Sequence, residues 1–443
     1  MIFKGIRHNF KVTFTAKEKE RINFCRIRSR RFLEPRNYPV LTMFFQAVAS
    51  VFVCLECMFA FVPDVYCDTI GAAFTYPVVK MICRCPIIAY VHYPMISTDM
   101  FRSVREKSPI YTIMNGIASH HTISYFKNLY YQIFAFAYGL AGRCADDVMV
   151  NSTWTRKHIE NLWTRRLINS RFVSQVDMSK KLCIQTLYPP CNVSALIKIP
   201  IRRRYRIILS VGQFRLEKNH SLQLRVFKAL YERDPNKYEN VYLMIVGSCR
   251  NHEDELQVKA LEMEAAELGI PKKNVVFKMN VPFSDLRRFY ALAAIGIHTM
   301  WNEHFGISIV EMMAAGLVVV AHNSGGPKDD IINISKQSRT GYLASNSQEY
   351  ADIIEDLLEK LDLREVPEGI KMHHSDGLKF FDVSYSDDAD RNLVSTTQSP
   401  SRLAATSERK LASRIAERAR ISTERFSDEL FSSKVITVFS KYF

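Results

Sequence analysis

The alternation of apolar runs and helical patterns from Arg206 onward constrains the fold most strongly. The apolar runs, among them 207–211 and 317–321, are rich in β-branched residues and lack the period-two alternation of half-exposed strands. That pattern is typical of strands covered on both faces. Five such strand–helix units predict a doubly wound parallel α/β sheet.

The first half of the chain repeats this pattern less regularly. Residues 63–68, 87–91 and 147–150 are predicted to form three more buried strands with helices between them, and Pro189-Pro190 breaks both kinds of element. We therefore predict two Rossmann-like domains facing a cleft, at 1–190 and 191–362. The Ser/Thr/Asp-rich stretch 365–407 is predicted to be a disordered insertion, and 408–443 a C-terminal helix.

Composition narrows the class of protein. Of 443 residues, 47% are hydrophobic and 24% charged, which excludes a wholly disordered or collagen-like chain. The formal net charge is +15, and residues 1–36 hold eleven Lys/Arg against three Glu. A basic surplus attracts phosphate-rich partners, namely nucleic acid, anionic lipid or phosphorylated substrates. The sequence has no zinc finger or RNA-binding signature, so a nucleic-acid partner is not expected.

Two apolar segments bear on membrane association. Residues 41–62 are about as long as a membrane span, but they contain Gln46 and Glu56, which favour a core or interfacial helix. The aromatic-rich segment 129–140 is shorter than a span and suits a helix lying in a membrane surface. The ten cysteines are scattered, which indicates a reducing compartment, and the Cys54–Cys57 pair is predicted to be buried thiols.

The most informative motif lies between 301 and 311. Glu303 falls in a loop after a predicted strand, and Glu311 falls on the helix that begins near Gly306. In open α/β sheets ligands bind at the carboxyl ends of the strands, and a helix N-terminus offers free N–H groups to phosphate. The loop therefore indicates a binding site. Its other candidate residues are Asn302, His304 and Phe305.

Three further loops at strand ends carry glycine and polar residues. Gly212 precedes Arg215 and Lys218, whose side chains can reach phosphate oxygens. Gly247 ends the next strand, and the Gly325-Gly326 turn can cradle a diphosphate with backbone amides. Together the four loops predict a nucleotide site.

The first half contributes candidates of its own. His92 follows a predicted strand, and we expect it to face Glu303 across the cleft. Asp99, in the same loop, is a candidate acceptor of a hydrogen bond from a substrate hydroxyl.

The stretch EHFGISIVE resembles the E-x7-E signature of retaining GT-B glycosyltransferases of family 4. The strings VHYPMISTDM, SVGQFRLEKNH, HTMWNEHFGI and AHNSGGPKDDI resemble the GDP-mannose-dependent α-1,2-mannosyltransferases within it. The resemblance covers about residues 30–362 and resumes at 425–431. It implies a GT-B fold and addition of the fourth and fifth mannoses to dolichol-pyrophosphate-linked Man3GlcNAc2, at the cytosolic face of the endoplasmic reticulum membrane.

The resemblance also implies roles for residues. Glu303 would contact the transferred sugar, Glu311 the ribose, Lys218 and an arginine the diphosphate, and His92 the acceptor. Gln213 stands where the family has that arginine, so Arg215 is assigned instead. No metal or other cofactor is expected besides the donor GDP-mannose. The implied partners are the lipid-linked acceptor, the membrane surface and other mannosyltransferases.

One feature departs from the family. Its members begin with a membrane-anchoring helix, a strand and a glycine-rich loop, and residues 1–40 contain no such strand or loop. We therefore expect a truncated N-terminal domain. The alternative to an active transferase is a catalytically silent isoform that binds nucleotide sugar or partner mannosyltransferases.

Overall fold

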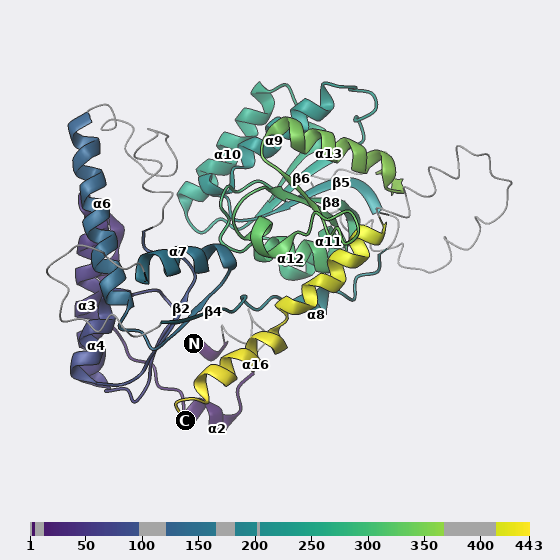
Figure 1. Cartoon of the computed structure of the whole chain (residues 1–443). Coiled ribbons are helices and arrows are strands. Elements are labelled where there is room, and N and C mark those ends of the chain that lie inside the picture. Colours follow the sequence, from purple (N-terminus) through teal and green to yellow (C-terminus); the bar gives the residue numbers. More distant parts are fainter. Residues whose placement is uncertain (1, 5–12, 97–120, 165–181, 202–203, 367–412) are drawn as a thin grey trace. The chain divides into compact units, whose positions relative to one another are not determined.

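The computed structural model describes residues 2–4, 13–96, 121–164, 182–201, 204–366 and 413–443. They contain two β-sheets with helices packed on them (Figure 1). Contacts divide the chain into two compact units. The first comprises Met1–Tyr90, Phe126–Val148 and Leu162–Cys183, and the second comprises Val91–Tyr125, Met149–Asn161 and Ile184–Phe443.

The first sheet has four strands in the order β1-β2-β3-β4. Both central strands are fully buried, as their mainly apolar sequences indicate, and they have the predicted bounds. The predicted strand at 63–68 is shorter, and the fourth strand was not predicted. The strands are β1 (Tyr66–Asp68), β2 (Ile87–Val91), β3 (Asp147–Val150) and β4 (Cys183–Thr186).

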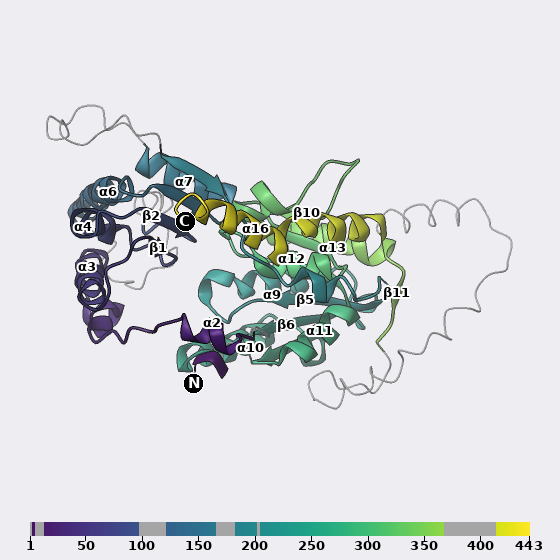
Figure 2. The ribbon, with the colours of Figure 1, turned by 90° about the horizontal axis from the view of Figure 1, so that it is seen from below.

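Helices α3, α4 and α6 lie together beside the first sheet (Figure 2). The amide of Phe44 in α3 donates to the hydroxyl of Tyr130 in α6 at 3.1 Å. All ten cysteines are free thiols, and Cys54 is buried as predicted whereas Cys57 is half-buried. The helical elements of this half are α2 (Ala16–Glu20), η1 (Ser29–Leu33), η2 (Pro35–Asn37), α3 (Thr42–Ala60), η3 (Ala73–Thr75), α4 (Tyr76–Ile82), α6 (His121–Gly142) and α7 (Thr153–Trp163).

The second sheet confirms the predicted doubly wound α/β architecture. Its order is β10-β9-β8-β5-β6-β7, with β11 added beside β5, and its pairs are parallel. All five predicted strands are present, whereas the two short strands β10 and β11 were not predicted. The strands are β5 (Arg204–Val211), β6 (Tyr242–Gly247), β7 (Val275–Met279), β8 (Ala293–His298), β9 (Val318–His322), β10 (Tyr342–Ala344) and β11 (Leu363–Arg364).

Helices cover both faces of this sheet (Figure 1). One core lies between the sheet and α8 (Val193–Leu196), α11 (Phe283–Leu292) and α12 (Ile307–Ala314). The other lies beneath α9 (His220–Tyr231), α10 (His252–Glu267) and α13 (Ser347–Lys360). The two cores fix the carboxyl ends of the strands, where the predicted site residues lie.

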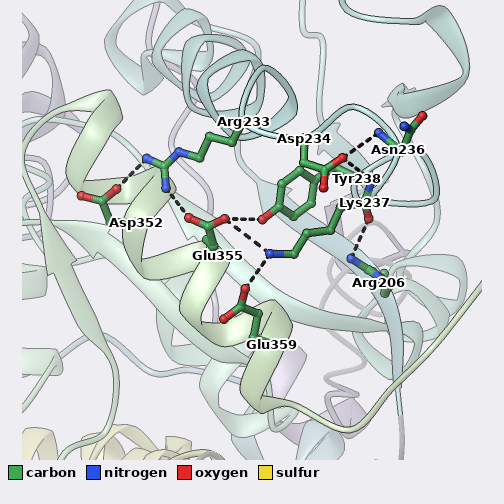
Figure 3. Close-up of polar contacts among 9 residues, drawn as sticks. All are labelled: Arg206, Arg233, Asp234, Asn236, Lys237, Tyr238, Asp352, Glu355 and Glu359. Atoms are coloured by element: carbon green, nitrogen blue, oxygen red, sulfur yellow. Dashed lines mark hydrogen bonds and ion pairs between the residues drawn. The ribbon is translucent and has the colours of Figure 1, made fainter.

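Helices α9 and α13 are further joined by charges (Figure 3). Arg233 follows α9 and contacts both Asp352 and Glu355 at 2.5 Å. The hydroxyl of the buried Tyr238 donates to Glu355, and Lys237 contacts Glu359 at 2.5 Å. This network holds the outer helices of the second unit together on the side of the sheet covered by α9 and α13.

Two arginines stabilise the C-terminal end of α12. Arg204 is buried and donates to the carbonyls of Tyr290, Ala293 and Ala315. Arg420 donates to those of Ala314 and Ala315, at 2.9 and 3.0 Å. Cations at this end complement the helix dipole and satisfy carbonyls left without intrahelical partners.

The C-terminal segment forms more than one helix. Residues 413–422 are helical, and they are followed by η7 (Thr423–Phe426) and α16 (Asp428–Phe439). Of the stretch 365–407, Glu365 pairs with Arg206 at 2.9 Å and Val366 is buried, while the rest lies outside the described residues.

Candidate functional site

The carboxylate of Glu303 is the centre of the candidate site. Glu303 follows β8 and is buried, and its Oε2 lies 2.5 Å from Nζ of Lys218 and 3.2 Å from Nε2 of His298. Lys218 ends the short helix η4 (Leu216–Lys218) after β5. Two of the four loops predicted to converge therefore meet through this ion pair.

The electrostatics of the pair keep Glu303 ionised. Burial alone would raise the pKa of the carboxyl, but the close approach of His298 and the charge of Lys218 outweigh it, so the pKa lies well below the usual 4.5. His220, the first residue of α9, is buried nearby, and burial lowers its pKa to about 3. The site thus presents an ionised carboxylate beside the side-chain nitrogen of Lys218.

The glycine turn after β9 packs directly on the loop that carries Glu303. The amide of Gly326 donates to the carbonyl of Glu303 at 2.8 Å, and the hydroxyl of Ser324 accepts from the amide of Asn302 at 2.8 Å. A Cβ on Gly325 would lie 2.3 Å from the carbonyl oxygen of Glu303, and one on Gly326 2.7 Å from that of His304. The third predicted loop therefore supports the site through its backbone.

Gly325→Ala is expected to lower the free energy of unfolding by about 2–5 kcal/mol, because Gly325 has a left-handed φ of +61° and its new methyl group overlaps Glu303. Gly269→Ala is the matched control, since Gly269 also has a left-handed φ, +68°, but its Cβ would meet only the end of Lys228 at 3.7 Å. It should cost about 1–2 kcal/mol. Urea unfolding of both variants tests this, and equal losses would contradict the close packing.

The remaining predicted loop, that of Gly247, adjoins the loop of Gly212. Gly247 approaches Gly212 so closely that a Cβ on it would lie 2.0 Å from the Gly212 carbonyl oxygen, and a Cβ on Gly212 would lie 3.7 Å from the Lys218 side chain. Arg215 is part-buried and its Nη1 lies 3.3 Å from Glu217. The loops after β5 and β6 are thus in contact, and Arg215 stands three residues before Lys218.

Phe305 and Glu311, two residues of the motif at 301–311, contact other side chains of the second unit. Phe305 is buried in the core, where its ring stacks on Tyr188 and meets Phe426 edge-on. Glu311 is half-buried on α12 and accepts from the hydroxyl of Tyr290 at 3.0 Å, and burial raises the pKa of its carboxyl. Gly306 begins the helix with a left-handed φ of +112°, which favours glycine there.

His304 lies in an aromatic stack within the second unit. Its ring stacks on Tyr93 with centroids 4.1 Å apart and on Trp154 at 5.1 Å, and burial lowers its pKa to about 4. Tyr93 is the neighbour of His92, which is exposed after β2. The structure thus brings Tyr93, the neighbour of His92, into contact with His304, the neighbour of Glu303. Asp99 lies outside the described residues.

Three residues around Glu303 and His304 were not predicted from the sequence. His298 closes β8 one residue before its loop, and Tyr93 and Trp154 flank His304. A polar residue at the end of the buried run AAIGIH was the available signal for His298. Across the described ranges, no three His, Cys, Asp or Glu side chains are grouped in a way that could hold a metal ion.

Comparison with known protein families assigns both halves of the chain. Residues 1–163 match the family described as "ALG11 mannosyltransferase N-terminus", and residues 196–368 match "Glycosyl transferases group 1". Among solved structures, an α,α-trehalose-phosphate synthase (UDP-forming) from Burkholderia vietnamiensis is similar, with a TM-score of 0.58 at 10% identity. The match covers 91% of this chain and 79% of that one. It confirms the predicted GT-B glycosyltransferase fold.

Several animal proteins that share one name are similar to this chain. The proteins named "GDP-Man:Man(3)GlcNAc(2)-PP-Dol alpha-1,2-mannosyltransferase" from Mus musculus and Homo sapiens are 40% and 42% identical to this chain. The mouse alignment covers 78% of this chain and 68% of the relative, and the human alignment covers 76% and 66%. This chain belongs to the GDP-Man:Man(3)GlcNAc(2)-PP-Dol alpha-1,2-mannosyltransferase family.

Proposed function

We propose that this chain transfers mannose from GDP-mannose to dolichol-pyrophosphate-linked Man3GlcNAc2 in α-1,2 linkage, adding the fourth and fifth mannoses of the N-glycan precursor. The names of its relatives support the reaction class, and the pairing of Lys218 with Glu303 at the strand ends carries the proposal. Both residues follow neighbouring strands of one sheet, β5 and β8.

The chemistry of the pair fits a nucleotide-sugar donor. A lysine ammonium and the nearby Arg215 can neutralise the charge that develops on a departing diphosphate, which is electrostatic stabilisation of the transition state. The carboxylate of Glu303 can accept hydrogen bonds from sugar hydroxyls. The donor phosphate itself is proposed to take the acceptor proton, so that retention of configuration needs no second carboxylate at glycosidase spacing.

A catalytically silent chain is the less favoured alternative. The relatives are named as transferases, and the Lys218–Glu303 pair of this chain is formed. A silent binding partner would have no need of a buried charged pair that is costly to desolvate.

The test is transfer of labelled mannose to the lipid-linked Man3GlcNAc2 acceptor by membranes that contain the full chain. We expect a product that grows by two mannoses and is shortened by an α-1,2-mannosidase. EDTA should leave the rate unchanged, because we propose that Lys218 and Arg215, rather than a metal, hold the diphosphate. Label transferred from a UDP-sugar instead of GDP-mannose would overturn the assignment of the donor.

We also propose that α3 attaches the chain to the cytosolic face of the endoplasmic reticulum membrane. Of the helices described, α3 is the one long and apolar enough to cross a membrane. Gln46 and Glu56 in this helix both have partners: Gln46 donates to the carbonyl of Leu33, and Glu56 accepts from the amides of Arg28 and Ser29 at 2.7 and 2.9 Å. The segment 28–33 therefore lies along the polar side of α3.

The face of α3 that carries Glu56 also carries exposed aromatic side chains one turn to either side of it, with Phe52 61% and Phe59 92% exposed. The segment 28–33 and its flanks add exposed arginines, among them Arg26, Arg28, Arg30, Arg31 and Arg36. An aromatic face bordered by cations is complementary to the interface of an anionic bilayer.

Flotation with liposomes tests the membrane proposal. Phe52→Ser/Phe59→Ser should lower the bound fraction on liposomes containing phosphatidylserine, while Ile334→Ser/Ile436→Ser should not. The control residues are similarly exposed, at 59% and 67%, but lie in the second unit. Equal binding by both variants would contradict the role of α3.

A further inference from the structure

His298 has an environment that packing alone does not explain. Its side chain is buried at the end of β8, and its backbone carbonyl accepts from the hydroxyl of Tyr350 at 2.8 Å. The ladder pairs it with Ala321 of β9. The backbone of His298 is therefore held in place by the sheet and by Tyr350.

The ring makes one polar approach, and that approach is to Glu303. Its Nε2 lies 3.2 Å from Oε2 of Glu303, and both ring nitrogens are buried without a well-aligned hydrogen bond among the described residues. A buried unpaired polar atom is unfavourable, and an apolar residue at the end of β8 would avoid that cost. The contact with Glu303 is thus the feature that distinguishes histidine from leucine at this position.

The two side-chain nitrogens near Glu303, Nζ of Lys218 and Nε2 of His298, lie close to the same carboxylate oxygen. Lys218 and His298 both approach Oε2, and no hydrogen bond to Oε1 is formed by the described part of the chain. A carboxylate held by one flexible lysine alone can swing about its side-chain torsions, because the ammonium is a point charge without directional preference. A second donor on a rigid strand removes that freedom.

We propose that His298 is a positioning residue, which holds Oε2 of Glu303 through Nε2–H so that Oε1 is presented to a hydroxyl of the donor sugar. The inference rests on the proposed transfer reaction. It adds a residue whose effect on the reaction passes entirely through Glu303.

The charged and titratable groups around His298 come from several elements. Lys218 ends η4, His220 begins α9, His322 ends β9, and Glu303 and His304 occupy the loop after β8. Burial lowers the pKa of His322, as it does those of His220 and His304. Lys218 and Glu303 are therefore the charges that accompany His298 near neutral pH.

Two substitutions separate positioning from packing. His298→Leu removes the donor and fills the site, so kcat for mannose transfer should fall about 10- to 100-fold while KM for GDP-mannose changes little. His298→Gln keeps an N–H near the position of Nε2 and should recover most of the rate. His252→Leu, at an exposed histidine that begins α10, is the control and should behave as wild type.

A second measurement needs no substrate. The urea-unfolding midpoint of each variant is followed from pH 7 to pH 3, and the acid loss of stability should begin at higher pH in His298→Leu than in His298→Gln. Neither variant has an imidazole at 298, so the comparison isolates the donor to Glu303.

The outcomes distinguish the two proposals. If wild type transfers mannose and His298→Leu does so equally well, or if the Gln variant is as slow as the Leu variant, the positioning role is wrong. If wild type transfers no mannose, the proposed function fails, and the acid profiles decide the role of His298 alone. Identical profiles of the Leu and Gln variants would overturn it.

Discussion

Lys218→Met is expected to destabilise the protein by about 3 kcal/mol or more, because it leaves the carboxylate of Glu303 buried without its cation. The two side chains are 22% and 11% exposed, so solvent compensates little for the lost partner. The double variant Lys218→Met/Glu303→Gln should recover most of the loss, since it removes the unpaired charge. Urea unfolding of the single and double variants gives the coupling between the two residues.

The pH dependence of the free energy of unfolding is an independent test of the same interaction. The pKa of Glu303 is lower in the folded protein than its usual 4.5, so the stabilisation it provides is complete above pH 4.5 and is lost as the pH falls below that value. Glu303→Gln should remove this contribution to acid unfolding. A double variant as unstable as the sum of the single variants would show that the two side chains do not interact.

The second large effect is expected at Arg204, which begins β5, the strand before the loop of Lys218. Arg204→Met should cost about 3–5 kcal/mol, because the buried carbonyls of Tyr290 and Ala293 lose this donor and that of Ala315 retains only Arg420 of its two arginine donors. The loss includes the C-terminal end of α12, whose first turn follows the loop of Glu303. The measurement is urea unfolding at pH 7.

Arg225→Met is the matched control for this substitution. Its guanidinium is 62% exposed and lies 3.6 Å from Glu264, so it should change stability by less than about 1 kcal/mol. Similar losses for the two arginine variants would contradict the assignment of Arg204 as a buried partner of backbone carbonyls.

The second sheet could be predicted because its strands are buried on both faces. Continuous apolar runs of five or six residues leave no other arrangement for a chain with helices between them. The meeting of Lys218 with Glu303 followed from the same topology, because parallel strands end at one edge of the sheet. Short strands such as β10 and β11 have no comparable pattern and were missed.

Side-chain partners were less predictable than backbone elements. Phe305 and Tyr188 belong to one aromatic core although they are far apart in sequence, and Glu311 meets Tyr290 on another helix. Gln46 and Glu56 argued against a membrane span at the level of composition, whereas the structure uses both to bind the segment 28–33. Such contacts depend on tertiary packing that periodicity does not encode.

The central claim is that Glu303 acts on the sugar of the bound donor. The most direct test is the rate of mannose transfer by Glu303→Gln, with GDP binding measured on the same protein. We expect a rate lower by at least about 100-fold with GDP affinity changed by less than about threefold, because the amide keeps the fold but not the charge. A variant that transfers mannose at the wild-type rate would contradict it.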